Sequence, residues 1–140
     1  MPMTQIAALP APRPEAAPRY PQEPLLEYLR TAQRSVRSRA RTDLFHACAA
    51  LSDDPEISAR ASAEVLMRCL GQALNKRPHL HRPGESARSF DEAWLLQLSN
   101  SLQSGDTSSA VFLLNSRVPP HARQGIIFLL RAVADGIRQF

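Results

Sequence analysis

The sequence predicts an all-α protein: a compact bundle of five or six helices with an αα-hairpin near the C-terminus, behind a disordered proline-rich leader. Three observations predict this fold. Apolar residues recur at helical spacing in the segments after Pro24. Prolines, capping residues and glycines punctuate these segments where helices begin and end. No segment alternates between apolar and polar residues as a strand does.

The leader is predicted to span residues 1–23, which are rich in proline and alanine and contain few large apolar side chains. Such a segment cannot bury enough surface to offset the entropy lost on ordering. The remaining residues, 24–140, have the usual size of one domain with a single hydrophobic core. We therefore expect one helical domain, which begins near Pro24.

The first helix is predicted at residues 25–40, with Pro24 in its first turn, where a missing N–H costs nothing. Its apolar stripe contains Leu25, Leu29 and Val36. A second stripe beside it consists of the arginines Arg30, Arg34, Arg37 and Arg41. A short helix over residues 42–51 is predicted to follow.

The next helix has the clearest start signal, with Asp54 as N-cap, Pro55 at the first position and Glu56 near the positive end of the helix dipole. It is predicted to run to Asn75. Its wide apolar face indicates a central helix, and Glu64 is expected on the opposite, polar face.

Residues 76–88 contain prolines and a glycine without helical periodicity and are predicted to form a long loop. Ser89 and Glu92 then form a capping box for a helix that ends at Gly105. A short helix follows Asp106, and the tight connection predicts an antiparallel αα-hairpin. The last helix is predicted from the proline pair at 119–120 to the C-terminus.

Composition excludes some classes of protein. No charge-free run approaches the ~20 residues that cross a bilayer, so no contact with a membrane is expected. The N-terminus lacks the basic start of a secretory signal, and we expect a cytoplasmic protein. The net charge of +4 rests on 16 arginines and one lysine, an imbalance typical of a GC-rich bacterial genome. Positive charge permits nucleic acid or an acidic protein as partner.

We predict no catalytic residue, metal site or cofactor. His79 and His81 in the loop, and His46 and Cys48 in a helical segment, are two residues apart. Helical ligands that share a face are three or four residues apart, so this spacing argues against a metal site. The serines near Gly105 lack the sequence context of a nucleophile and are expected to cap helices. The sequence therefore favours binding over catalysis.

Two surfaces are candidates for binding. The arginine stripe of Arg30, Arg34, Arg37 and Arg41 can meet an acidic partner or an anion. Ile127 and Phe128 lie off the main apolar stripe of the last helix, so they either contact a partner or form a second core contact. The expected function is that of a regulatory or adaptor protein that binds another protein. Nucleic-acid binding by a transcriptional regulator, and self-association, are the alternatives.

The order of several features resembles the FlaF family, whose small helical proteins regulate flagellin synthesis and export. The shared landmarks are Tyr28 and Arg30 opening an arginine-rich helix that leads to Phe45, Pro78 and Pro83 around the loop, Trp94, Gly105 with Asp106, and Leu113, Leu114, Asn115 and Arg117. The chain departs from the family at residues 66–70, where an Asn-Arg-x-Leu-Trp stretch would fall, and in its last helix. The resemblance implies a regulator of flagellin synthesis or export.

Overall fold

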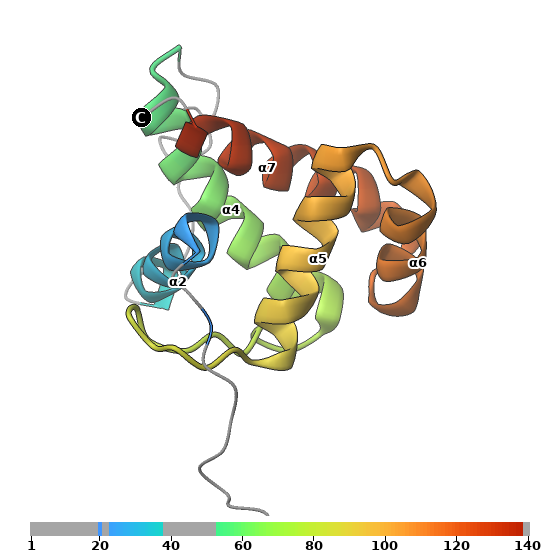
Figure 1. The fold of residues 1–140 in the computed structure, drawn as a ribbon, viewed down its shortest axis with the longest axis horizontal. Coiled ribbons are helices and arrows are strands. Elements are labelled where there is room, and N and C mark those ends of the chain that lie inside the picture. Colours follow the sequence, from blue (N-terminus) through green and yellow to red (C-terminus); the bar gives the residue numbers. More distant parts are fainter. Residues whose placement is uncertain (1–19, 21–22, 38–52, 139–140) are drawn as a thin grey trace, which may run out of the picture.

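The computed structural model describes residue 20 and residues 23–37 and 53–138, which form five α-helices and no strand. The helices, labelled as in Figure 1, are α2 (Pro24–Arg37), α4 (Pro55–Leu74), α5 (Phe90–Ser104), α6 (Thr107–Arg117) and α7 (Pro120–Arg138). None of these helices is long and apolar enough to cross a membrane. The all-α fold is thus confirmed for this part of the chain.

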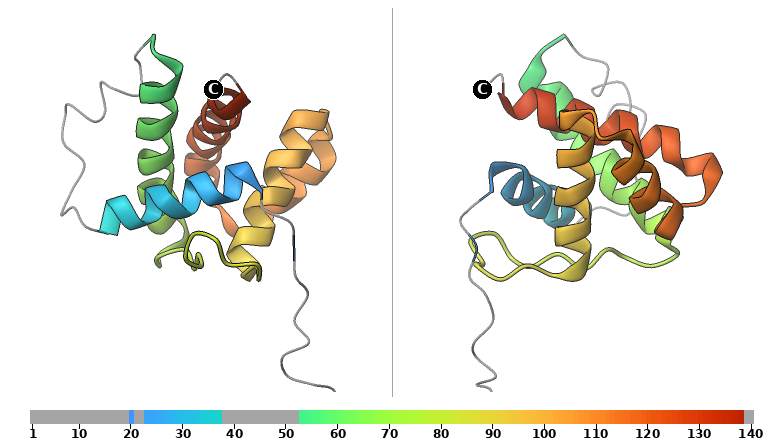
Figure 2. Two further views of the ribbon diagram at one scale, coloured as in Figure 1. Left: turned by 60° about the vertical axis from the view of Figure 1, so that its left-hand side comes forward. Right: turned by 45° about the vertical axis from the view of Figure 1, so that its right-hand side comes forward.

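The helices pack in a bundle around α4 (Figures 1 and 2). α7 makes the most extensive contact with α4 and runs antiparallel to it, since Gly136 lies against Ala59 whereas His121 lies beside Cys69. α2 packs on another side of α4, and α5 contacts both α2 and α7. α5 and α6 pack directly on one another across the short turn at Gly105, which confirms the predicted hairpin.

The helix boundaries follow the capping signals. The side chain of Asp54 accepts from the amide of Glu56 at 3.0 Å, and Pro55 is the first residue of α4. Ser89 and Glu92 form both bonds of a capping box at the start of α5. Gly105 ends α5 with φ 75°, a left-handed conformation that glycine adopts without steric cost. These local signals explain where α4 and α5 begin and where α5 ends.

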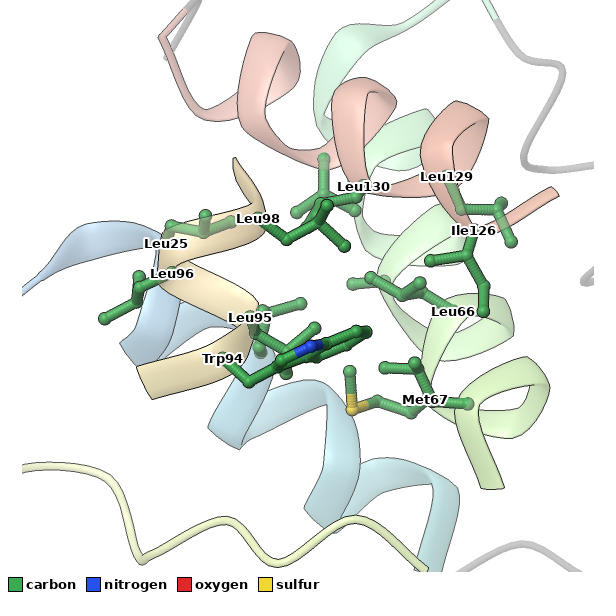
Figure 3. Close-up of a cluster of buried hydrophobic side chains, with 14 of the residues drawn as sticks. Leu25, Leu66, Met67, Trp94, Leu95, Leu96, Leu98, Ile126, Leu129 and Leu130 are labelled. Carbon is green, nitrogen blue, oxygen red and sulfur yellow. The ribbon is translucent and has the colours of Figure 1, made fainter. Parts of the chain in front are cut away.

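The core lies between α2, α4, α5 and α7. Figure 3 shows the ring of Trp94 near the thioether of Met67, with aliphatic side chains of α2, α4, α5 and α7 in the same cluster. The fully buried members are Leu29 of α2, Leu66 and Leu70 of α4, Leu98 of α5, and Ile126, Leu130 and Val133 of α7. Burying one such side chain contributes about 1.5–3 kcal/mol relative to leaving it exposed. The indole N–H of Trp94 donates to the carbonyl of Leu113 at 3.1 Å and thereby fixes α6 to α5.

Three features of the prediction are either different in the structure or lie outside the described residues. The structure describes α2 only to Arg37, and the predicted helix at 42–51 lies outside the described residues. Glu64, expected on a polar surface, is buried and accepts a hydrogen bond from the hydroxyl of Ser35 at 2.6 Å. This happens because α2 covers that side of α4, which the periodicity of α4 alone does not reveal.

Candidate interaction surface

Arg30 lies inside the domain, and its surface is only 1% exposed. Its Nε donates to Oε2 of Glu92 at 2.6 Å, and its Nη2 donates to Oε1 of the same carboxylate at 3.0 Å. Glu92 itself is fully buried, with 0% exposure. This two-pronged contact matches the planar guanidinium to the planar carboxylate and is the strongest geometry for such a pair. It connects α2 to the first turn of α5.

Every N–H of the Arg30 guanidinium has an acceptor. Besides the two bonds to Glu92, Nη1 donates to a carboxylate oxygen of Glu27 at 2.6 Å. The other two donors reach backbone carbonyls of the loop before α5, those of Glu85 at 2.9 Å and Ala87 at 3.0 Å. Because guanidinium has five N–H groups, the burial of this charge leaves none unsatisfied. Arg30 therefore holds the loop as well as the helix.

Residues 76–88, which we call the basic loop, are also held through their amides. Three side-chain carboxylates accept hydrogen bonds from backbone N–H groups of the loop. The pairs are His79 N to Asp91 Oδ2 at 2.6 Å, His81 N to Glu92 Oε2 at 2.9 Å, and Gly84 N to Glu27 Oε1 at 2.6 Å. Gln33 of α2 adds a bond from its side chain to the carbonyl of Pro78 at 3.1 Å. The loop is thus tied to α2 and α5 along its length.

The pKa values of two acidic groups in this network, Glu92 and Asp91, are lowered. Burial opposes the charge of Glu92, but hydrogen bonds from Arg30 and from the amides of Ser89 and His81 outweigh it, so the pKa of Glu92 lies below its ordinary value. Burial likewise opposes the charge of Asp91. The amide of His79 and the guanidinium of Arg117 outweigh it and lower the pKa of Asp91. The pKa of Arg30 is raised, chiefly by its hydrogen bond to Glu92.

The outer face of the basic loop is cationic. Lys76, Arg77 and Arg82 are exposed, as is the imidazole of His79, whose ring meets that of His81 edge-on at 5.2 Å. Arg34 is exposed on α2, on the same stripe as Arg30. None of these four arginine and lysine side chains forms an ion pair with a residue that the structure describes. Their charge is therefore available at the surface.

Tyr20 contacts the far end of the basic loop. Its amide donates to the carbonyl of Ser86 at 3.1 Å, and the guanidinium carbon of Arg88 lies 4.3 Å from the centroid of its ring. This distance is typical of a cation–π contact. A residue ahead of α2 thus takes part in the same assembly.

A second surface lies on the α5–α6 hairpin and on α7. A groove of about 570 Å³ runs between α5 and α6, and Phe112, which is 71% exposed, stands in its wall. The other lining residues carry amides, hydroxyls or hydrocarbon, and are Gln97, Asn100, Ser101, Ser108, Ser109 and Leu113. Val111, the neighbour of Phe112, is 47% exposed and faces a smaller concavity, which Ile127 of α7 also lines. Large apolar side chains thus occupy both flanks of α6.

The four arginines of the predicted stripe do not share one environment. Arg30 is internal and is not available to a partner, since Glu27, Glu92 and the loop carbonyls occupy its donors. Arg34 is on the surface. Arg37 is the last residue of α2, and Arg41 lies outside the described residues.

The two apolar candidates on α7 have different environments. Ile127 is half-buried and packs against the core, which is the second of the two roles considered for it. Phe128 is 63% exposed. Of the two, only Phe128 therefore exposes most of its surface to a partner.

Sequence reasoning missed the roles of Glu27, Asp91 and Glu92. All three lie in the first turn of a helix, where the helix dipole ordinarily explains an acidic residue. The signal that distinguishes them is tertiary, because Arg30 and Glu92 are 62 positions apart in the chain. The presence of an arginine on an otherwise ordinary helix face does not indicate which distant carboxylate it meets.

Among the described residues, no group of three or more histidines, cysteines, aspartates or glutamates is placed to hold a metal ion. Comparisons of the chain with protein-family models, with curated proteins and with solved structures gave no match. The resemblance to FlaF thus stays a prediction.

Proposed function

We propose that this chain is a non-enzymatic regulatory or adaptor protein of the bacterial cytoplasm, which binds another protein through α6 and the adjoining face of α7. The observation that carries the proposal is the exposure of Phe112 and Phe128, at 71% and 63%, on these two helices. Aromatic side chains dominate the binding energy of many protein interfaces, where they insert into pockets of the partner. Exposed aromatic residues on neighbouring helices are thus the expected signature of a docking surface.

The packing of α6 supports the same proposal. Of its 11 residues, only Ala110 and Leu114 are buried. Its apolar content exceeds what the hairpin uses, because Val111 and Phe112 remain exposed. We call these two residues, together with Phe128, the α6–α7 ridge. A helix that stabilises its own domain so little, yet keeps large apolar side chains, fits a role in contacting a second molecule.

The chemistry of the hairpin groove also favours binding over catalysis. Its lining of amides, hydroxyls and hydrocarbon contains no carboxylate, imidazole or thiol that could transfer a proton or attack a substrate near neutral pH. Amides such as those of Gln97 and Asn100 can instead pair with the backbone of a bound peptide. The groove is thus suited to hold a segment of a partner against Phe112.

The test is affinity capture from a bacterial lysate with the tagged full-length chain, compared with the variants Phe112→Ser and Phe128→Ser. We expect each variant to lose the same subset of captured proteins. Ile57→Ser is the matched control, because Ile57 is also an exposed apolar residue, at 47%, but lies in the first turn of α4. Light scattering of the purified chain identifies a second copy as the partner. An unchanged set of captured proteins, or an equal loss in the control, would contradict the proposal.

A FlaF-like role is the narrower form of this proposal, with flagellin synthesis or export as the process regulated. Two landmarks of the resemblance have structural tasks in this chain. Trp94 is a core residue bonded to Leu113, and Gly105 with Asp106 forms the turn of the hairpin. The rest of the likeness must therefore be tested directly. Co-purification of flagellin with the wild-type chain, and not with Phe112→Ser, would support this role.

A further inference from the structure

The basic loop differs from an ordinary surface loop because its backbone is fixed before any partner arrives. Arg30 holds two of its carbonyls, and three carboxylates hold the amides of His79, His81 and Gly84. A loop that is already ordered loses little conformational entropy when it binds. Its side chains therefore project from a defined scaffold.

The same network leaves positive charge on the surface. Asp91 and Glu92 are turned inward, where backbone amides and the guanidinium groups of Arg117 and Arg30 compensate their charge. Four cations around them form no ion pair with a described residue, although Lys76 lies near enough to Asp91 to favour its charge: Arg34, Lys76, Arg77 and Arg82. Arg34 belongs to this group because it lies one turn after Arg30 on the same face of α2, the face that meets the loop at Glu85 and Ala87. The result is a cationic surface shared by α2 and the loop.

The composition of this surface favours a phosphate backbone over an acidic protein as its ligand. The centre of a protein interface ordinarily contains apolar or aromatic residues. No large apolar side chain is exposed between residues 76 and 88, where Pro78 is buried and Leu80 is half-buried. The exposed aromatic residues beside the loop, Tyr20 and Phe90, already lie against the guanidinium groups of Arg88 and Arg117. Binding to nucleic acid needs no such anchor, because the release of counterions from the phosphates drives it.

We propose that Arg34 and the basic loop bind the phosphate backbone of nucleic acid without reading its sequence. This goes beyond the proposed function, since the surface uses α2 and the basic loop and none of the residues of the α6–α7 ridge. Guanidinium groups suit the task because their planar N–H donors match two phosphate oxygens at once. The structure offers no recognition helix here, so contacts to phosphate alone are proposed.

The experiment measures the binding of the full chain to a fluorescent DNA duplex, and to a single strand of the same sequence, between about 50 and 200 mM salt. Four phosphate contacts predict that the logarithm of affinity falls with the logarithm of salt with a slope of roughly −3.6 for the duplex. Arg77→Gln and Arg82→Gln should each make this slope less steep by about one. Arg131→Gln, which removes one exposed charge from α7, is the control and should keep the wild-type slope.

A second variant tests whether DNA binding requires the fixed conformation of the loop or only the positive charge of the chain. Glu27→Ala removes the carboxylate that accepts from Gly84 and raises the net charge by one. General attraction predicts tighter binding to DNA, whereas a loop that must be held in place predicts weaker binding. We expect weaker binding, with circular dichroism showing that the helices remain folded.

Three results would overturn the proposal. The first is the absence of binding to either nucleic acid at the lowest salt concentration. The second is an equal loss of slope in Arg131→Gln, which would reduce the effect to net charge. The third is tighter binding of polyglutamate than of either nucleic acid at the same salt concentration, which would assign the surface to an acidic protein. The α6–α7 ridge proposal is unaffected by each of these, so the two can fail separately.

Discussion

Arg30 and Glu92 form the polar centre of this domain, and their burial makes them interdependent. Moving either charge out of water is costly, and the cost is offset only while the partner and the loop groups stay in place. Each residue also satisfies backbone groups of the basic loop, at Ala87 and His81 respectively. Removal of one therefore leaves unsatisfied polar atoms in the interior as well as an uncompensated charge.

Replacing Arg30 with leucine should lower the free energy of unfolding by about 3–5 kcal/mol, because Glu92 would stay buried without its partner. Urea denaturation followed by circular dichroism measures this. The matched control is Arg34→Leu, one helical turn further along α2, which should change the free energy by no more than about 0.5 kcal/mol because Arg34 is exposed. An effect of Arg30→Leu as small as that of Arg34→Leu would contradict the burial of Arg30.

The network also predicts how stability depends on pH. The pKa of Glu92 and that of Asp91 are lower in the folded chain than in the unfolded one, where carboxyl groups titrate near 4. Both groups thus contribute stability that is fully present above about pH 5 and is lost as the pH falls through the folded pKa.

Glu92→Gln should accordingly unfold more easily at neutral pH, and its stability should change less than that of the wild type as the pH falls below about 4. Urea midpoints measured across this range give both quantities. Parallel pH profiles for the two proteins would show that Glu92 is not held ionised in the folded state.

At the scale of elements, α4 and α7 approach each other closely at Gly136. A Cβ atom placed on Gly136 would lie 2.6 Å from the Cβ of Ala59, which is closer than such atoms come in proteins. The lack of a side chain at Gly136 thus permits the close contact of the two helices. This requirement concerns space alone, since Gly136 lies within the helix.

Gly136→Ala should therefore destabilise the domain by about 1–3 kcal/mol, the usual cost of overpacking. The control is in the same helix. Gly125 has no atom within 4 Å of where its Cβ would lie, so Gly125→Ala should stabilise the chain by about 0.5–1 kcal/mol through helix propensity. Thermal unfolding of the two variants gives the comparison, and a shift of the same sign in both would contradict the packing described for α4 and α7.

The elements themselves were largely predictable, because their signals are local. Asp54 with Pro55, and Ser89 with Glu92, act within one turn of the chain, and both boundaries are confirmed. The side of a helix that becomes buried is not a local property, because it depends on which other helices pack against it. Glu64 was placed on a polar face because nothing in α4 indicates that α2, with Ser35, packs there.

At the scale of the whole molecule, the two surfaces have distinct locations. The basic loop runs along α2 and leads into the start of α5, whereas α6 lies on the other side of α5 (Figures 1 and 2). The sequence indicated part of each surface, namely Arg34 on one and Phe128 on the other. It did not indicate the cations of the loop as a surface, because their exposure depends on the inward orientation of Glu27, Asp91 and Glu92.

The central claim, that buried charges hold the basic loop in one conformation, is tested most directly by amide hydrogen exchange. A loop with surface-exposed residues ordinarily exchanges at the rate of an unstructured chain. The amides of His79, His81 and Gly84 should instead be protected as strongly as those of the adjoining turns of α5, and this protection should be lost in Arg30→Leu. Fast exchange of these three amides in the wild-type chain would contradict the account.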